Sequence, residues 1–206
     1  MTGKRMGIFS LCFLAFLVLG CASMQPKLPV DELSSKPGTQ VSFRGKPAKL
    51  LGTPIELGKP LPSVPLVDAM TMEDVDLSKM TGQVLFLSIV PSLDTPVCEA
   101  QTHYLSEQGN QLPSTIKRIA ISRDTPFAQK RFAKEAKLTN IQYLSDYREG
   151  AFGRATGLLM ENLMLLARSV VIVDRQGVVQ YIQVVPEISH LPEMDKAFQK
   201  AIELAK

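Results

Sequence analysis

Cysteine and histidine are scarce in this chain, and tryptophan is absent. The 206 residues include three cysteines, at positions 12, 21 and 98, and two histidines. The sequence has no CxxC motif, which excludes disulfide exchange between two neighbouring thiols. It has no cluster of metal-ligand residues and no glycine-rich phosphate loop, so neither a metal nor a cofactor is predicted. His103 lies five residues after Cys98, about 140° around a helix, so a Cys–His hydrolase is not predicted.

The N-terminal segment has the layout of a signal peptide. Lys4 and Arg5 precede an apolar stretch, residues 6–19, that is too short for a comfortable membrane span. The stretch runs into "LVLGC", which resembles the bacterial lipobox, where cleavage leaves a lipidated cysteine at the new N-terminus. We therefore predict a lipoprotein signal peptide at residues 1–20 and lipidation of Cys21; an uncleaved membrane anchor is the alternative.

Export in this form places the mature protein on a membrane, facing the periplasm or the cell surface. Ala22 stands where an aspartate would mark inner-membrane retention in enteric bacteria, which favours the outer membrane. Cleavage removes two of the 23 basic residues against 20 acidic ones, so the mature chain is nearly neutral and no nucleic-acid partner is predicted. Because Cys12 is discarded and the Cys21 sulfur carries lipid, Cys98 is the only free thiol.

Residues 21–38 have the composition of a linker. The seventeen residues after Cys21 contain three prolines and little periodicity, which predicts a flexible tether. At roughly 3.3 Å per residue, such a tether reaches at most about 55 Å. Residues 39–206 remain for one domain with a substantial core.

Strand and helix patterns alternate through that domain. "TQVSF" and "AKLLG" around "RGKP" predict an N-terminal β-hairpin, and residues 83–90 and 115–122 predict buried strands. Helices are expected from about residue 96 to 109, from 126 to about 137, and at the C-terminus after a strand hairpin. This order predicts an α/β sandwich of the thioredoxin-like type, with a mixed central sheet and helices on both faces. The apolar positions predicted to form the packed side of the first helix are Val97, Ala100, Tyr104 and Leu105.

Cys98 lies where the first buried strand gives way to a helix. Thr95 suits the N-cap and Pro96 the first helical position, which places Cys98 in the first turn. There the helix dipole and free backbone N–H groups favour the thiolate over the thiol. An inert, packed thiol is the alternative reading of the same position.

Longer motifs around Cys98 resemble a known family. "PSLDTPVC" resembles the active-site signature of peroxiredoxins, in particular that of the bacterial thiol peroxidases. "VSFRGKPAKL" resembles the N-terminal hairpin of that subfamily, "SRDTPFAQKRF" its "SADLPFAQSRF" segment, and "LARSVVIVD" its "AARAVVVID" strand. The resemblance covers residues from about 40 to 206.

The resemblance implies a peroxidase and a role for four residues. Cys98 would be the peroxidatic cysteine, whose thiolate attacks the peroxide and becomes a sulfenic acid. Thr95 would hydrogen-bond the peroxide, Pro91 would shield the thiolate from water, and Arg168 would direct its guanidinium at Cys98 and the peroxide. The implied substrates are hydrogen peroxide and alkyl or lipid hydroperoxides, and the implied assembly is a homodimer.

One position departs from the family pattern. Ala133 stands where the thiol peroxidases usually carry a resolving cysteine, so Cys98 cannot form an internal disulfide. The expected cycle therefore uses one cysteine, and an external thiol reduces the sulfenic acid. The alternative function is a non-catalytic, membrane-tethered redox sensor or interaction protein that uses the oxidation of Cys98.

Overall fold

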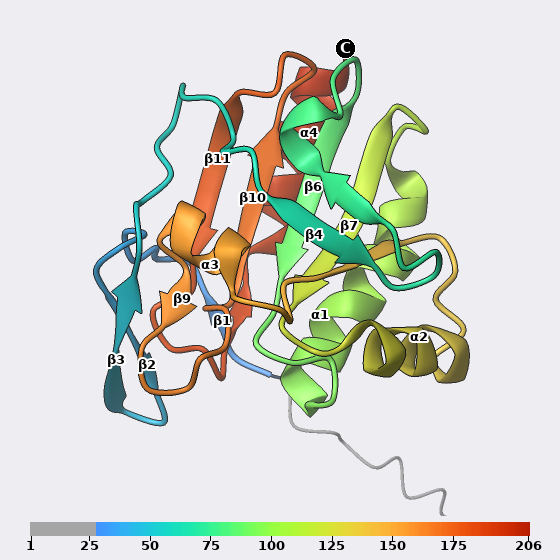
Figure 1. Ribbon diagram of the computed structural model, residues 1–206. Coiled ribbons are helices and arrows are strands. Elements are labelled where there is room, and N and C mark those ends of the chain that lie inside the picture. The colour runs from blue at the N-terminus through green and yellow to red at the C-terminus, as the bar shows by residue number, and fades with distance from the viewer. Residues whose placement is uncertain (1–27) are drawn as a thin grey trace, which may run out of the picture.

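The computed structural model describes residues 28–206 (Figure 1). The predicted signal peptide and Cys21 lie outside the described residues. Within residues 28–206, no helix has the length and apolar character needed to cross a membrane. The strands are β1 (Val30–Asp31), β2 (Gln40–Phe43), β3 (Lys46–Leu51), β4 (Pro65–Asp68), β5 (Asp74–Asp76), β6 (Val84–Ile89), β7 (Ile116–Ser122), β8 (Gln142–Ser145), β9 (Leu159–Met160), β10 (Ser169–Val173), β11 (Val179–Val184) and β12 (Leu191–Pro192). The helices are α1 (Pro96–Glu107), α2 (Pro126–Glu135), α3 (Ala151–Thr156) and α4 (Met194–Ala205), with short 3-10 turns at Leu77–Lys79 and Gln108–Gln111.

A mixed seven-stranded sheet forms the centre of the domain, in the order β11-β10-β6-β7-β8-β4-β5. Strands β6, β7 and β8 run parallel, whereas β10 and β11 on one side and β4 and β5 on the other join antiparallel. The parallel strands are connected through α1 and α2, because parallel neighbours need a crossover. The predicted thioredoxin-like sandwich with a mixed sheet is therefore confirmed.

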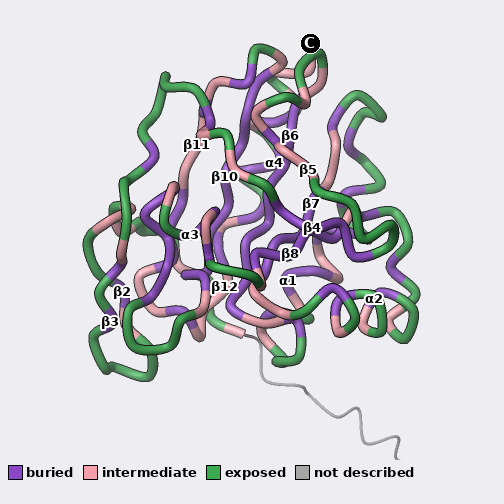
Figure 2. Tube along the Cα trace, viewed as in Figure 1, coloured by how far each residue is buried: buried purple, intermediate pink, exposed green. Residues whose placement is uncertain are grey.

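The two faces of the sheet bury separate apolar clusters. Along β6 every residue is buried, and alternate side chains serve opposite faces: Leu85 and Leu87 join one cluster, Val84 and Phe86 the other. Helices α1, α2 and α4 cover the face that carries Phe86, and α4 packs on β10, β6 and β7. Helix α3 covers part of the other face, and Figure 1 shows it in front of the sheet with α4 behind. Figure 2 shows the central strands buried between these layers.

The N-terminal hairpin forms as predicted. Strands β2 and β3 pair antiparallel around the turn at Arg44 and Gly45. A third strand, β9, adds to the outer side of β3 and was not predicted, because two residues give no periodic signal. This small sheet packs Val41 and Leu50 against the central sheet.

The predicted tether is wrong over its second half. Val30 and Asp31 form β1, which pairs in parallel with Leu191 and Pro192 of β12. Ser35 then donates its backbone N–H to Val184. The prolines of this segment do not prevent docking, because proline lacks only the N–H donor: the Pro29 carbonyl accepts the Leu191 backbone N–H at 2.8 Å. Residues 28–38 therefore belong to the folded domain, which was predicted to start at residue 39.

Candidate active site

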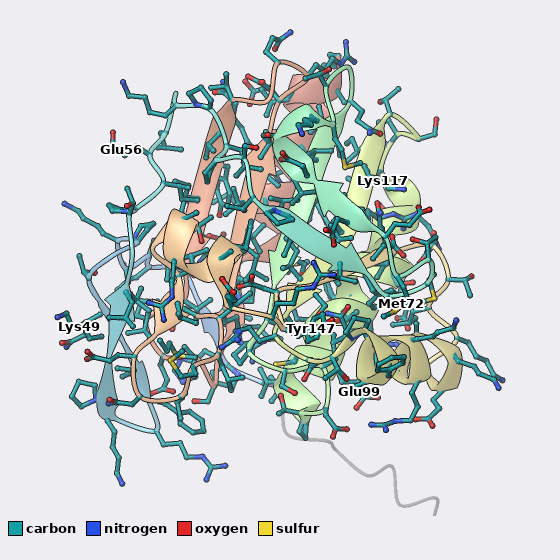
Figure 3. The ribbon with its side chains drawn as sticks, viewed as in Figure 1. Lys49, Glu56, Met72, Glu99, Lys117 and Tyr147 are labelled. Atoms are coloured by element: carbon teal, nitrogen blue, oxygen red, sulfur yellow. The ribbon has the colours of Figure 1, made fainter. Side chains whose placement is uncertain are left out.

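Cys98 sits in the first turn of α1, as predicted. A tight connection follows β6, and Thr95 takes the N-cap position, with Pro96 as the first helical residue. The Glu99 backbone N–H donates to the carbonyl of Thr95 at 2.9 Å, which closes that turn. The thiol points inward, and Cys98 is fully buried in the cluster beneath α1. Its neighbour Glu99 lies on the outside of the same turn (Figure 3).

Arg168 reaches Cys98 because of the strand register. Strand β10 runs antiparallel to β6, and Ser169 at its start pairs with Ile89 at the end of β6. The residue before Ser169 therefore lies at the sheet end from which the chain enters α1. Arg168 is only 2% exposed there, not a solvent-facing charge.

The Arg168 guanidinium makes three buried hydrogen bonds. Nη2 donates to the Cys98 Sγ at 3.3 Å, Nη1 to the Gln101 Oε1 at 2.7 Å, and Nε to the Ile188 carbonyl at 2.8 Å. The pKa of Arg168 is lowered overall, because the effect of burial outweighs the charge attraction and the hydrogen bond to Cys98, which raise it. A buried cation is costly without partners, and the Cys98 sulfur is one of the three acceptors that the Arg168 guanidinium has here.

Gln101 belongs to the site and was missed in the sequence. It is completely buried one turn after Cys98, where it accepts from Arg168 and donates through Nε2 to the Ser88 Oγ at 2.8 Å. The apolar packed side predicted for α1 is therefore wrong in part. The buried positions of α1 are Cys98, Gln101, Thr102, Leu105 and Ser106. The i, i+3 spacing of Gln101 from Cys98 was the available signal.

Pro91 and Thr95 lie in the same connection but in different environments. Pro91 is buried directly after the strand segment, at the base of the loop. Thr95 is exposed, and its hydroxyl donates to the Ser92 carbonyl at 3.2 Å instead of capping α1. Thr95 therefore holds the predicted position without the predicted side-chain cap. The hydroxyl bonds within its own loop because that carbonyl lies three residues back, within reach of a short side chain.

Ala133, the position of the missing resolving cysteine, is buried in α2. Its side chain belongs to the same apolar cluster as Cys98, on the same face of the sheet. Cys98 is the only cysteine within the described residues. Among those residues, no group of three or more His, Cys, Asp or Glu side chains is placed to hold a metal ion.

A thioredoxin-like sheet with one buried thiol against a buried arginine defines a class of thiol-based redox protein. Comparisons with known proteins narrow this class. Residues 56–198 match the redoxin family. The chain is 41% identical to a thiol peroxidase of Listeria innocua, over 79% of this chain and 98% of that protein. It is 35% identical to a thiol peroxidase of Bacillus subtilis, over 81% of this chain and 99% of that protein.

A solved structure agrees with these relatives. The crystal structure of a peroxiredoxin-like protein from Aquifex aeolicus superposes with a TM-score of 0.75 at 33% identity, covering 81% of this chain and 97% of that one. The chain therefore belongs to the redoxin family, and within it to the bacterial thiol peroxidases of the peroxiredoxin type. It is an enzyme, a thiol-dependent peroxidase.

Proposed function

We propose that Cys98 is the peroxidatic thiol and that it works in a one-cysteine cycle on hydrogen peroxide and on alkyl or lipid hydroperoxides. The observation that carries this proposal is the 3.3 Å contact between Arg168 Nη2 and Cys98 Sγ, made where both residues are buried. Both the fixed positive charge and the start of α1 stabilise a thiolate, which is the nucleophilic form of cysteine.

The first step is a two-electron oxidation of Cys98. The thiolate attacks the hydroxyl oxygen of the peroxide, the O–O bond breaks, and the sulfur becomes a sulfenic acid. The leaving oxygen takes a proton from water and departs as water or an alcohol. Arg168 stabilises the negative charge that moves onto this oxygen. Thr95 is proposed to hydrogen-bond the bound peroxide, and Pro91 to keep water from the sulfur.

The second half of the cycle needs thiols from outside the chain. One thiol condenses with the sulfenic acid to give a mixed disulfide and water. A second thiol then attacks this disulfide, which releases reduced Cys98 and an oxidised reductant. The alanine at position 133 supports this route, because it leaves Cys98 without a resolving partner.

Turnover by residues 22–206 with a panel of reductants tests this function. We expect continuous peroxide consumption with an added thiol, and a Cys98 sulfenic acid that a dimedone-type trap captures when no thiol is added. The Cys98→Ser variant should consume no peroxide. One equivalent of sulfenic acid without turnover under every reductant would instead fit the redox-sensor function.

We also propose that Cys21 carries lipid and holds the enzyme on a membrane, facing the periplasm, with the outer membrane favoured, or facing the cell surface. "LVLGC" supports this proposal. Because β1 begins at Val30, nine Cα steps of roughly 3.3 Å separate it from Cys21, so the domain would stay within about 30 Å of its anchor. Mass spectrometry of the mature N-terminus tests the proposal. The Cys21→Ala variant should leave the membrane fraction or stay unprocessed, and an unmodified wild-type N-terminus would contradict lipidation.

A further inference from the structure

The thiol of Cys98 is completely enclosed, yet both of its reaction partners come from outside. Cys98 has no exposed surface, and buried Pro91 and Leu93 precede it in the connection from β6. The tip of that connection is open to solvent at Asp94 and Thr95. A reducing thiol is larger than a peroxide, so the segment 91–97, here named the cysteine loop, must move to admit it.

The cysteine loop is attached to the rest of the domain by the packing of Leu93 in the apolar cluster and by hydrogen bonds to one carboxylate, Asp124. Ser92 donates its hydroxyl to Asp124 Oδ1 at 2.7 Å, and Leu93 donates its backbone N–H to Asp124 Oδ2 at 2.7 Å. This contact joins segments that are distant in sequence: Ser92 and Leu93 follow β6, whereas Asp124 lies between β7 and α2. Short hydrogen bonds to an ionised carboxylate are about twice as strong as neutral ones.

Asp124 is itself held in place by hydrogen bonds from neighbouring strands. Ser122 donates its hydroxyl to Asp124 Oδ2 at 2.7 Å, and the Ser145 hydroxyl donates to the Asp124 backbone carbonyl. Thr125 then caps α2 by accepting the Ala128 backbone N–H at 3.3 Å. Asp124 therefore lies in the connection between β7 and α2, held by hydrogen bonds from β7 and β8, and the cysteine loop contributes the two donors Ser92 and Leu93.

We propose that Asp124 is a positioning residue that holds the cysteine loop closed over Cys98. The closed loop keeps the thiolate against Arg168 for the reaction with peroxide. Release of Ser92 and Leu93 from Asp124 exposes the sulfur to the external thiol. The carboxylate thus sets the balance between the peroxide step and the reduction step. This proposal rests on the proposed role of Cys98 as the reacting thiol.

The test compares two carboxylates that accept similar hydrogen bonds. Asp174 accepts backbone N–H groups from Gln176 and Val178 and the side-chain amide of Gln180, in the turn between β10 and β11. The variants are Asp124→Asn and the control Asp174→Asn. An asparagine Oδ1 can still accept one bond, but its amide cannot accept from the Leu93 N–H. Reduced protein is alkylated with iodoacetamide, and its rate of reaction with hydrogen peroxide is measured separately.

We expect Asp124→Asn to raise the alkylation rate of Cys98 about tenfold and to slow its reaction with peroxide, whereas Asp174→Asn changes neither. Ser92→Ala removes a single bond to the same carboxylate and should shift both rates in the same directions by less. If Asp124→Asn does not fold, Ser92→Ala tests the proposal in its place.

Equal alkylation rates in the wild type and in the folded loop variants would overturn the proposal. An equal rise in Asp174→Asn would also overturn it, because the effect would then be general loosening. Alkylation does not depend on peroxide chemistry. If Cys98 proves unreactive toward peroxide in every variant, the proposed function fails separately from this inference.

Discussion

Arg168 and Cys98, the two residues of the proposed reactive pair, are held in place to different degrees. Arg168 is fixed on three sides, by Cys98 and Gln101 from α1 and by the Ile188 carbonyl from the loop after β11. All three bonds are buried. The segment that delivers Cys98 is solvent-exposed from Asp94 to Pro96, and the helix that it opens has no side-chain cap.

This difference indicates which half can move. Displacing Arg168 would leave a buried cation and several buried acceptors without partners, which is expensive. Opening the cysteine loop uncovers Leu93, but Asp94, Thr95 and Pro96 are already exposed. Segments with few buried groups open at lower free energy than the core. We therefore expect Arg168 to stay in place, while the cysteine loop moves Cys98 toward it and away from it.

Replacing Arg168 gives the largest expected effect on the rate of reaction with peroxide. Arg168→Lys keeps a positive charge but loses the planar fork that bonds Cys98, Gln101 and Ile188 together. We expect the second-order rate with hydrogen peroxide to fall about 100-fold, the scale seen when one donor to a developing oxyanion is lost. Stopped-flow measurement of Cys98 oxidation checks this.

The matched control is Arg118→Lys. Arg118 is a partly buried arginine whose Nη1 donates to the Ser106 carbonyl at 3.1 Å, at the far end of α1. Its peroxide rate should stay near that of the wild type. Equal losses in both variants would mean that Arg168 acts only through stability.

The second largest effect is expected when a resolving thiol for Cys98 is introduced at position 133. Ala133→Cys places a thiol in α2, within the same apolar cluster as Cys98. A disulfide needs Cα atoms within roughly 7 Å, and the family resemblance implies that the segments around positions 98 and 133 open locally to form it. With one equivalent of peroxide we expect most of the variant to close an internal disulfide and to resist oxidation to sulfinic acid.

Non-reducing peptide mapping reads this outcome. A peptide that joins positions 98 and 133 supports a mobile cysteine loop. Sulfinic Cys98 beside an unpaired cysteine at position 133 would show that the two segments do not open together. The family's internal disulfide chemistry would then be closed to this chain beyond its first step.

The smallest expected effect is a change in stability at Glu187, next to the Ile188 carbonyl that binds Arg168. Burial raises the pKa of Glu187, but hydrogen bonds from Ser189, Gly45, Arg44 and Ser42 outweigh burial and lower it to about 2. This carboxylate anchors the loop that offers the Ile188 carbonyl to Arg168. A depressed pKa stabilises the fold above the ordinary value of 4.5, and the contribution is lost as pH falls toward about 2.

The Glu187→Gln variant should therefore lose about 2 °C in Tm at pH 7 and show a flatter fall in Tm between pH 5 and pH 2. Glu203→Gln is the control, since Glu203 is an exposed carboxylate on α4 that forms an exposed ion pair with Lys200. Calorimetry across pH separates the two. Identical pH profiles for wild type and Glu187→Gln would contradict the assigned pKa direction.

The elements with strong periodic or positional signals were predictable from the sequence. An unbroken apolar run predicted β6, and the Thr-Pro pair predicted the start of α1 and so the place of Cys98. The burial of Arg168 against Cys98 was predicted only through family resemblance, because no local pattern distinguishes a buried arginine from an exposed one.

The remaining features depend on contacts between distant segments. Gln101 and Asp124 are polar residues whose partners lie on other elements, so their environment follows from the register of β6 against β10 and from the crossover through α2. The docking of Val30 and Asp31 was missed for the same reason, since their partners in β12 are 161 residues away in sequence. A proline-rich composition predicts a linker whenever such a partner is not visible.

The most direct test of the account is to follow Cys98 through one oxidation and one reduction. Wild-type protein receives one equivalent of hydrogen peroxide and is then given excess external thiol, with mass spectrometry of the Cys98 peptide at each stage. The account predicts one added oxygen atom on Cys98, no disulfide within the chain, a transient mixed disulfide, and full return of the thiol. An unmodified Cys98 after peroxide is consumed, or a sulfenic acid that no thiol reduces, would contradict it.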